Sequence, residues 1–413
     1  MIGQHGKVNH NTSVAFIGGP LPLKKIEGNE AFSMAGYLVT SNIIKGLRNI
    51  GVDLSLILSF FPVPAWPKST LLFSHGGLET LEDGTPVTRL GFPNVIPLKQ
   101  LWLGLVGAFN LIQWGFRHRK DAKRVLLCYN LSVPPGCLIW VAAKITRSKM
   151  IAIVYDIDLP GVTVPNTIWH RLNFAQTKAV MPHLDGIVGI TEWVERDFAP
   201  RVPSICVPGG ISDSLIELFS VENDQEYKHK DLPTVVFAGH LSLSNGIGLL
   251  LDALNEAPEI NVSLELIGDG PLLMRAKEIS KRDSRVKVRG RLSYDEVLLA
   301  YKAADAIVSL RLQETFKTPY LFPSKLLEAM AVGKPLICTL PRNAPTTLQC
   351  ALRKWAIVVE SEKRESVVSA LKMLTTGDMI EANHKARMLR AWAIENLSWR
   401  NQCQKIKDLI DRV

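Results

Sequence analysis

Short runs of hydrophobic residues alternate along the chain with longer segments in which hydrophobic residues recur every three or four positions. The short runs are typical of buried strands, and the longer segments are typical of amphipathic helices. Alternating strands and helices predict a parallel sheet covered by helices on both faces. In the first half of the chain, this pattern predicts strands at 14–18, 52–60, 124–128, 150–154, 186–190 and 204–207, and helices at 35–49, 101–119, 136–146, 168–179 and 192–198.

A polar segment, Val221–Asp231, interrupts the alternation, which then starts again. We therefore predict an α/β domain at 1–212, a linker at 213–232, a second α/β domain at 233–396, and a last helix at 397–413 that packs back on the first domain. Ligands of doubly wound sheets bind at the carboxyl ends of the strands. In the second domain, the predicted strands are 234–238, 263–267, 286–288, 306–310, 335–338 and 356–359, and the predicted helices are 246–254, 271–280, 293–303, 324–331 and 361–374.

The charge of the chain narrows the choice of partners. Its 413 residues include 48 Lys and Arg against 39 Asp and Glu, a net charge of +9. A basic excess favours nucleotides, nucleic acid or an anionic membrane face. Aromatic residues are not interleaved with the basic ones, so we expect no nucleic-acid partner. Six scattered cysteines, a polar N-terminal segment and the lack of an apolar run of spanning length favour a cytoplasmic protein.

One hydrophobic segment leaves two alternatives open. Leu101–Phe116 contains two Trp and no charged residue, and the basic sequence RHRKDAKR follows it. Such a segment can make a peripheral contact with an anionic membrane, or it can be a buried helix of the first domain. Because its apolar residues are spread too evenly to define one face, the pattern favours the buried helix.

The main candidate chemistry lies in the sequence FPSKLLEAMAVGKP, which begins at Phe322. Pro323 suits a helix start, and Ser324 is the predicted N-cap of a helix whose first N–H groups can hold a phosphate. Lys325 adds a positive charge there. Glu328 lies on the same helix face, and its carboxylate can accept hydrogen bonds from the hydroxyls of a ribose. The alternative is a glutamate that only complements the helix dipole.

Other strand-to-helix turns of the second half can also approach a phosphate. They lie in the sequences FAGHLSLSNGIG, LELIGDGP and VKVRGRLSYDEV. Neither half carries G-x-G-x-x-G after its first strand, which disfavours a nicotinamide-dependent dehydrogenase. The candidate residues at these turns are Gly239, His240, Asn245, Gly246, Gly268 and Arg291.

In their order and spacing, these segments resemble glycosyltransferase family 4, whose members are retaining nucleotide-sugar transferases with the GT-B fold. The segment FPSKLLEAMAVGKP is similar to the corresponding helix of those members that have Pro-Ser-Lys at its start. A weaker resemblance extends into the first half of the chain, at DGIVGITEWVERDF. The resemblance implies two Rossmann-like domains facing across a cleft, and a nucleoside-diphosphate sugar as donor. It also implies a glycan or lipid-linked glycan acceptor from cell-surface polysaccharide or glycolipid biosynthesis, and no metal or other cofactor.

The resemblance implies roles for individual residues. Glu328 matches the second Glu of the family's Glu-x7-Glu motif, which binds the ribose, while Tyr320 stands at the first. The Arg and Lys that clamp the diphosphate in the family fall at His240 and Asn245, so Lys325 must carry more of the phosphate charge. The implied catalytic residues are Asp156, Tyr320 and Lys325. The implied donor site comprises Gly239, His240, Asn245, Gly246, Gly268, Arg291, Ser324, Lys325, Leu326 and Glu328.

The first domain should bind the acceptor. Family members often have a His-Asp pair after a central strand, where this chain reads IVYDIDLPG. Asp156 and Asp158 are therefore candidates for contacting sugar hydroxyls, and the capping of a turn is the alternative. Asn29 and Glu30 lie in the first strand–helix loop, a usual place for ligand contacts, and Gly36 matches the family's glycine before its first long helix.

Two other functions stay open on the sequence. A nucleotide-sugar epimerase has a similar two-domain fold, but it needs acidic catalysts that the sequence does not place. A protein that binds a nucleotide sugar or a partner without turnover is the other, because Tyr320, His240 and Asn245 depart from the family's pattern.

Overall fold

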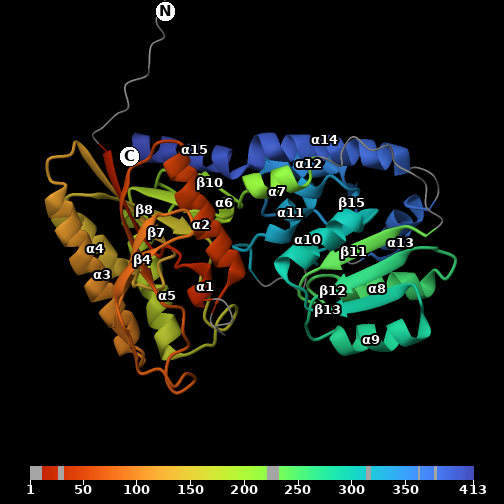
Figure 1. Ribbon diagram of the computed structural model, residues 1–413, viewed down its shortest axis with the longest axis horizontal. Coiled ribbons are helices and arrows are strands. Elements are labelled where there is room, and N and C mark those ends of the chain that lie inside the picture. The colour runs from red at the N-terminus through yellow and green to blue at the C-terminus, as the bar shows by residue number, and fades with distance from the viewer. Residues whose placement is uncertain (1–11, 27–31, 221–231, 313–317, 361–362, 376–378) are drawn as a thin grey trace, which may run out of the picture. The chain divides into compact units, whose positions relative to one another are not determined.

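The chain divides into two compact units in the computed structural model, which describes residues 12–26, 32–220, 232–312, 318–360, 363–375 and 379–413. Unit 1 comprises Met1–Pro208 and Trp399–Val413, and unit 2 comprises Gly209–Ser398. Each unit is built on one large, mainly parallel sheet with helices on its faces (Figure 1). The alternating pattern of the sequence predicted this layering.

The sheet of unit 1 has eight strands in the order β10-β9-β8-β7-β1-β2-β5-β4. Only the pairing of β4 with β5 is antiparallel among the strand pairs of this sheet in the described residues. Its central strands are apolar and buried because helices cover both faces. The strands are β1 (Thr12–Ile17), β2 (Leu54–Phe60), β4 (Gly77–Thr80), β5 (Pro86–Leu90), β7 (Lys123–Tyr129), β8 (Lys149–Val154), β9 (Gly186–Gly189) and β10 (Ser204–Cys206).

A small ribbon of unit 1 and strands β4 and β5 were missed by the sequence pattern. In the ribbon, β3 (Phe73–Ser74) pairs antiparallel with β6 (Phe92–Pro93). These strands are only two residues long, and β4 is mostly exposed, so neither shows a run of buried residues. The other strands expected in the first half are confirmed.

Helices from both ends of the chain complete unit 1. The C-terminal helix α15 (Trp399–Arg412) packs on α2 and β10. A Cβ on Gly46 of α2 would lie 2.4 Å from Cys403 Sγ, so this glycine lets the two helices approach closely. The other helices are α1 (Leu23–Ile26), α2 (Met34–Asn49), α3 (Leu98–Arg117), α4 (Gly136–Thr146), α5 (Ile168–Val180) and α6 (Glu192–Phe198).

Helix α3 is only partly the buried helix that the sequence favoured. Leu103, Leu111 and Trp114 are buried against the sheet and α4, but Trp102 and Phe109 on the other face are about half exposed. The expectation was wrong for this outer face because both faces of the helix are apolar. Within the part of the chain that the structure describes, no helix has the length and apolarity that a bilayer crossing requires.

The sheet of unit 2 has six parallel strands in the order β13-β12-β11-β14-β15-β16. The chain adds β12 and β13 on one side of β11 and then places β14 on the other side. Loops after β11 and β14 therefore leave the sheet in different directions. The strands are β11 (Thr234–Ala238), β12 (Ser263–Ile267), β13 (Val286–Gly290), β14 (Ala306–Ser309), β15 (Leu336–Cys338) and β16 (Ile357–Val358).

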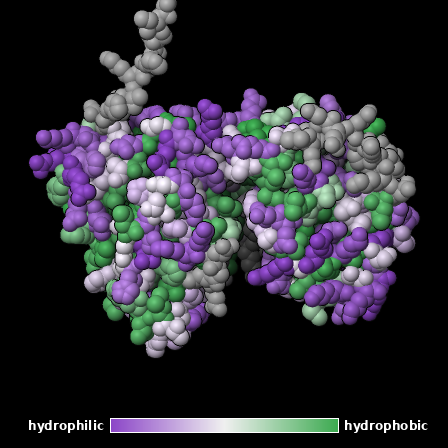
Figure 2. Space-filling view, viewed as in Figure 1, coloured by the Kyte–Doolittle hydropathy of each residue, from purple (hydrophilic) through white to green (hydrophobic). Residues whose placement is uncertain are grey.

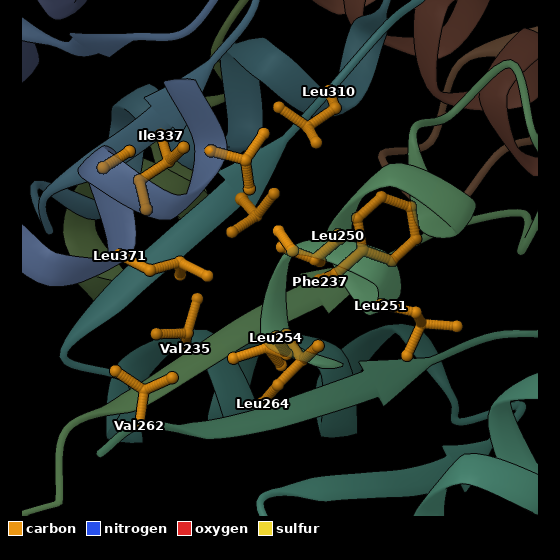
Figure 3. Packing of buried hydrophobic residues seen from close by; sticks show 14 of the residues in the cluster. Val235, Phe237, Leu250, Leu251, Leu254, Val262, Leu264, Leu310, Ile337 and Leu371 are labelled. Carbon is orange, nitrogen blue, oxygen red and sulfur yellow. The ribbon is translucent and has the colours of Figure 1, made fainter. Parts of the chain in front are cut away.

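The core of unit 2 lies between this sheet and helices α8 (Ile247–Glu256) and α13 (Arg364–Met373). Figure 3 shows Val235 and Phe237 of β11 close to Leu250 and Leu254 of α8 and to Leu371 of α13, all at most 4% exposed. Burying one such side chain contributes about 1.5–3 kcal/mol relative to leaving it exposed. The strand that leads into the candidate site is thus firmly held.

Three other helices of unit 2 were not predicted from the sequence: α7, α12 and α14. Arg390 of α14 donates hydrogen bonds to Ala331 O at 2.8 Å and to Ile216 O at 3.0 Å, which fixes α14 against α11 and α7. Helix α7 lies inside the expected linker 213–232, and residues 221–231 are outside the described ones. The helices are α7 (Asp213–Leu218), α9 (Leu273–Arg282), α10 (Tyr294–Ala303), α11 (Ser324–Val332), α12 (Thr346–Trp355) and α14 (Met379–Leu397).

Candidate functional site

A cavity of about 130 Å³ opens in unit 2 at the carboxyl ends of β11 and β14. These strands flank the point where the strand order of the sheet reverses, and open α/β sheets bind ligands at this point. Asn245 and Tyr301 also line the cavity, together with the segments 237–240, 308–311 and 322–325. Loops after two strands and the start of helix α11 therefore converge on one space.

The start of helix α11 reaches this cavity. Ser324 is the first residue of the helix and not its N-cap, which corrects the prediction; Pro323 stands at the cap position and makes no side-chain hydrogen bond to the helix. Phe322, Pro323, Ser324 and Lys325 line the cavity. An uncapped helix start presents N–H groups and the positive end of the helix dipole, which suit a phosphate.

Lys325 and Glu328 form an ion pair beside the cavity. Lys325 Nζ lies 2.8 Å from Glu328 Oε2 and 5.5 Å from the centre of the Tyr294 ring. Burial, and then the negative charge of Glu328, raise the pKa values of Tyr294 and Tyr301 above their usual range. Lys325 lines the cavity and Glu328 does not. The contact of Glu328 with a ribose therefore stays a prediction.

His240 and Asn245, which stand where the resembled family has cations, belong to one loop and are hydrogen-bonded to each other. Asn245 Nδ2 donates to His240 O at 2.7 Å, and Asn245 Oδ1 accepts from Arg311 Nη1 at 2.6 Å. The Arg311 backbone N–H donates to Thr339 Oγ1 at 2.8 Å, and the Thr339 hydroxyl donates to Arg311 O at 3.0 Å. Hydrogen bonds therefore hold both the side chain and the backbone of Arg311 in place.

Arg311 is the residue of this site that the sequence reasoning missed. It lies two residues after β14, lines the cavity, and is a cation that burial shifts to a lower pKa. An arginine keeps its charge under such a shift because its ordinary pKa is so high. In the sequence, the signal for this residue was a single Arg two positions after a buried strand. The side chains that line the cavity include Arg311, Lys325 and His240, and no Asp or Glu among the described residues.

Two predicted glycines allow other groups to pack closely against the backbone. A Cβ on Gly268 (φ +133°) would lie 1.9 Å from Gly239 O, and a Cβ on Gly246 (φ +70°) would lie 2.7 Å from Leu310 Cβ. Gly268 therefore permits the close approach of another backbone segment, and neither glycine lines the cavity. Arg291, which pairs with Asp269 at 3.4 Å, does not line the cavity either, and nor does the buried Leu326.

Tyr320 is described by the structure but does not line the cavity. Its backbone N–H donates to Thr318 Oγ1 at 3.3 Å. A catalytic role for Tyr320 stays a prediction.

The acceptor candidates of unit 1 follow strand β8. Asn130 Oδ1 accepts from the N–H groups of Tyr155 at 2.9 Å and Asp156 at 3.1 Å, which fixes the turn after the strand. The Asp156 side chain keeps access to solvent, but the protein around it and the nearby Asp158 carboxylate raise its pKa. Asp158 Oδ2 accepts from Asn173 Nδ2 at 3.3 Å. Among the described residues, no three His, Cys, Asp or Glu side chains are placed to hold a metal ion.

The remaining acceptor candidates lie at the start of α2. The Gly36 N–H donates to Ser33 Oγ at 3.2 Å, so Gly36 belongs to the capped first turn of the helix. Asn29 and Glu30 are outside the residues that the structure describes.

Most of unit 2 matches a known family. Residues 232–376 match the family described as Glycosyl transferases group 1. The matched segment contains all the cavity residues named above. A sequence comparison with curated proteins finds no match.

Solved structures match nearly the whole chain, and they establish its fold. A glycosyltransferase from Rickettsia africae is 13% identical with a TM-score of 0.65, over 97% of this chain and 98% of that one. Sucrose-phosphate synthase from Thermosynechococcus elongatus is 14% identical with a TM-score of 0.62, over 97% and 98%. Anabaena HepE in complex with UDP and glucose is 16% identical with a TM-score of 0.60, over 97% and 100%. The predicted GT-B architecture, an α/β fold with two domains of parallel-strand sheets, is confirmed.

Proposed function

We propose that the protein transfers a sugar from a nucleoside-diphosphate sugar to an acceptor hydroxyl. The cavity of unit 2 carries the proposal, because Arg311, Lys325 and an uncapped helix start converge on it and no carboxylate among the described residues lines it. A diphosphate is a compact polyanion that such a site neutralises. The match of residues 232–376 to Glycosyl transferases group 1 supports the same donor class.

The proposed chemistry follows from the leaving group. When the bond between sugar and phosphate breaks, negative charge grows on the diphosphate, and fixed donors aimed at it stabilise the transition state. Arg311, Lys325 and the N–H groups of α11 are these donors. No metal is required for this stabilisation. In a retaining transfer, a donor phosphate oxygen takes the proton of the acceptor hydroxyl on the same face of the sugar, so no covalent nucleophile is needed.

The acceptor in this proposal binds to unit 1, at Asp156 and Asp158. The Asp156 side chain keeps access to solvent, and its carboxyl oxygens can accept hydrogen bonds from sugar hydroxyls. A glycan or lipid-linked glycan from cell-surface polysaccharide or glycolipid biosynthesis is the proposed acceptor class. Its support is that a lipopolysaccharide outer core galactosyltransferase, WaaB, shares the fold at 14% identity and a TM-score of 0.60.

A protein that binds a nucleotide sugar without turnover is the second candidate function. The observation that favours it is the use of Asn245 within the protein, where both ends of its amide already bond to His240 and Arg311. Release of nucleoside diphosphate from a nucleotide sugar by the purified protein separates the two functions. The transferase produces it and the second candidate does not.

A thermal-shift screen tests the donor class. The purified chain is melted with UDP, GDP, ADP, dTDP and CMP, each with and without EDTA. A ligand that binds only the native state stabilises it, by about 2.7 kcal/mol at a hundredfold excess over Kd. We expect one nucleoside diphosphate to raise the melting temperature equally with and without EDTA. No shift with any nucleoside diphosphate contradicts the proposal.

A further inference from the structure

The outer face of helix α3 is largely apolar, although Gln113 on it is also exposed. The exposed side of a surface helix is ordinarily polar. Here the exposed side chains recur at intervals of three, four and seven residues, so they form one stripe on the helix surface. Each of them is between 47% and 60% exposed: Leu98, Leu101, Trp102, Leu105, Phe109 and Phe116.

Helix α4 extends this surface. It packs beside α3 so closely that a Cβ on Gly104 of α3 would lie 2.4 Å from the Leu138 side chain of α4. On its outer side, Val141 is 44% exposed and Ile145 is 51% exposed. We call these two residues and the α3 stripe the α3–α4 face. Figure 2 shows hydrophobic residues reaching the surface on the side of unit 1 where α3 and α4 lie in Figure 1.

Exposed cations gather at one end of the α3–α4 face. The two helices end side by side, since Arg124 donates from Nη1 to His118 O at 3.2 Å and from Nη2 to Thr146 O at 3.1 Å. Around these ends lie five exposed basic side chains: Arg117, Arg119, Lys120, Lys144 and Arg147.

The positive charge of this region is large for its length. Residues 96–149 hold nine Lys or Arg and one Asp, while the whole chain has a net charge of +9. This aspartate, Asp121, already accepts a hydrogen bond from Ser13 Oγ and is hydrogen-bonded to His118 Nδ1. Cations at helix ends complement the helix dipole, but the dipole does not explain the apolar stripe beside them.

We propose that the α3–α4 face docks on the surface of an anionic phospholipid bilayer. Leu, Phe and Trp side chains enter the boundary between headgroups and acyl chains, while the basic end pairs with anionic headgroups. The basic end of the face is complementary in charge to anionic headgroups, which favours a membrane over a second, equally basic copy of the chain. The docking is independent of sugar transfer and is tested without it.

Vesicle flotation of the full chain tests the docking. The probes are phosphatidylcholine vesicles with and without phosphatidylglycerol, at low and high salt. One variant, L105S/F109S, removes apolar surface, and a second, K120E, reverses a charge. Matched controls in unit 2 are L299S and K281E, whose original side chains are also exposed. Unchanged melting temperatures show that each variant folds.

We expect binding to the anionic vesicles that weakens in high salt. L105S/F109S should lose about tenfold or more in vesicle affinity, since two apolar side chains no longer leave water. K120E should lose at least about fivefold, since one cation near an anionic surface contributes about that much. L299S and K281E should bind as the unchanged chain does.

Three outcomes overturn the proposal. They are no binding to anionic vesicles, binding that L105S/F109S leaves intact, and a dimer in light scattering that L105S/F109S abolishes while vesicles stay unbound. The last outcome would make the α3–α4 face an interface between copies of the chain.

Discussion

At the scale of the residue, part of the positive charge of the cavity comes from an element that the family resemblance did not implicate. Asn245 stands where the family has a cation, and its amide positions Arg311 from the end of β14. The sequence shows an Arg after a buried strand, but it does not show where the guanidinium points. That direction depends on Asn245 and on Thr339, which lies 28 residues further along the chain. Such long-range contacts are invisible to periodicity and spacing.

Glu328→Gln tests the ribose contact. We expect the unchanged protein to prefer the best nucleoside diphosphate over its 2′,3′-dideoxy analogue by about tenfold or more, because a hydrogen bond to a charged group contributes about 1.5–3 kcal/mol. In the variant this preference should fall below about threefold, as measured by calorimetry. Its free energy of unfolding should change by less than about 1 kcal/mol, since the Lys325 partner is 42% exposed. A preserved preference for the ribonucleotide removes Glu328 from the ribose site.

Lys99 of α3 predicts a pH dependence of stability. Its ammonium donates to Val63 O in a buried position, and burial lowers its pKa from 10.5 to about 8. In the unfolded chain the group keeps its ordinary pKa, so between pH 8 and 10.5 the unfolded state binds more protons and stability rises with pH. Lys99→Met lacks this gain. When the pH rises from 7.5 to 9, the unchanged chain should therefore gain about 1 kcal/mol in free energy of unfolding over the Lys99→Met variant.

Urea titrations of both proteins at the two pH values measure this difference. A difference between them that stays constant with pH would show that Lys99 titrates normally.

At the scale of the element, the sequence predicted the strands and helices that have a clear face or a fully apolar run. Strands β11 and β14 and helix α8 are of this kind. Helix α14 was missed because its buried residues are small or scattered, such as Ala386 and Ala393, and its place is fixed by hydrogen bonds of Arg390. Its packing depends on α11 and α7, which no local pattern reveals.

Gly268→Ala tests the close contact between the turns after β11 and β12. A Cβ there would lie 1.9 Å from Gly239 O, at a φ of +133°. We expect the free energy of unfolding to fall by more than about 3 kcal/mol, because neither the backbone angle nor the space allows the methyl group. Gly290→Ala is the matched control, since Gly290 has a φ of +70° but nothing within 4 Å of the added Cβ.

The control should cost only the strain of the left-handed angle, about 1–2 kcal/mol. Chemical denaturation compares the two variants. Equal losses would mean that the Gly239 backbone yields, so that Gly268 does not fix the turn that carries His240.

At the scale of the whole molecule, two groups of cations stand out in a chain with a net charge of +9. The charge predicted anionic partners but could not say how many or where. In unit 2, Arg311 and Lys325 line an inner cavity suited to a diphosphate. In unit 1, exposed cations lie beside the apolar α3–α4 face. The first surface suits a donor and the second suits a membrane, and separate variants test them.

In the proposed function, Arg311 and Lys325 bind the diphosphate of the donor. The measurement is calorimetric titration with the best nucleoside diphosphate and with its nucleoside, for the unchanged chain and for Arg311→Gln and Lys325→Gln. Lys281→Gln and Arg282→Gln, at exposed positions on α9, are the matched controls. Melting temperatures establish that the variants are folded.

Each of the two variants should lose about tenfold to a hundredfold in affinity for the diphosphate, because a charge-assisted hydrogen bond contributes about 1.5–3 kcal/mol. Their affinity for the nucleoside should change by less than about threefold, and the controls should bind both ligands as before. Equal losses for nucleoside and diphosphate, or a diphosphate affinity that neither variant lowers, would contradict the account.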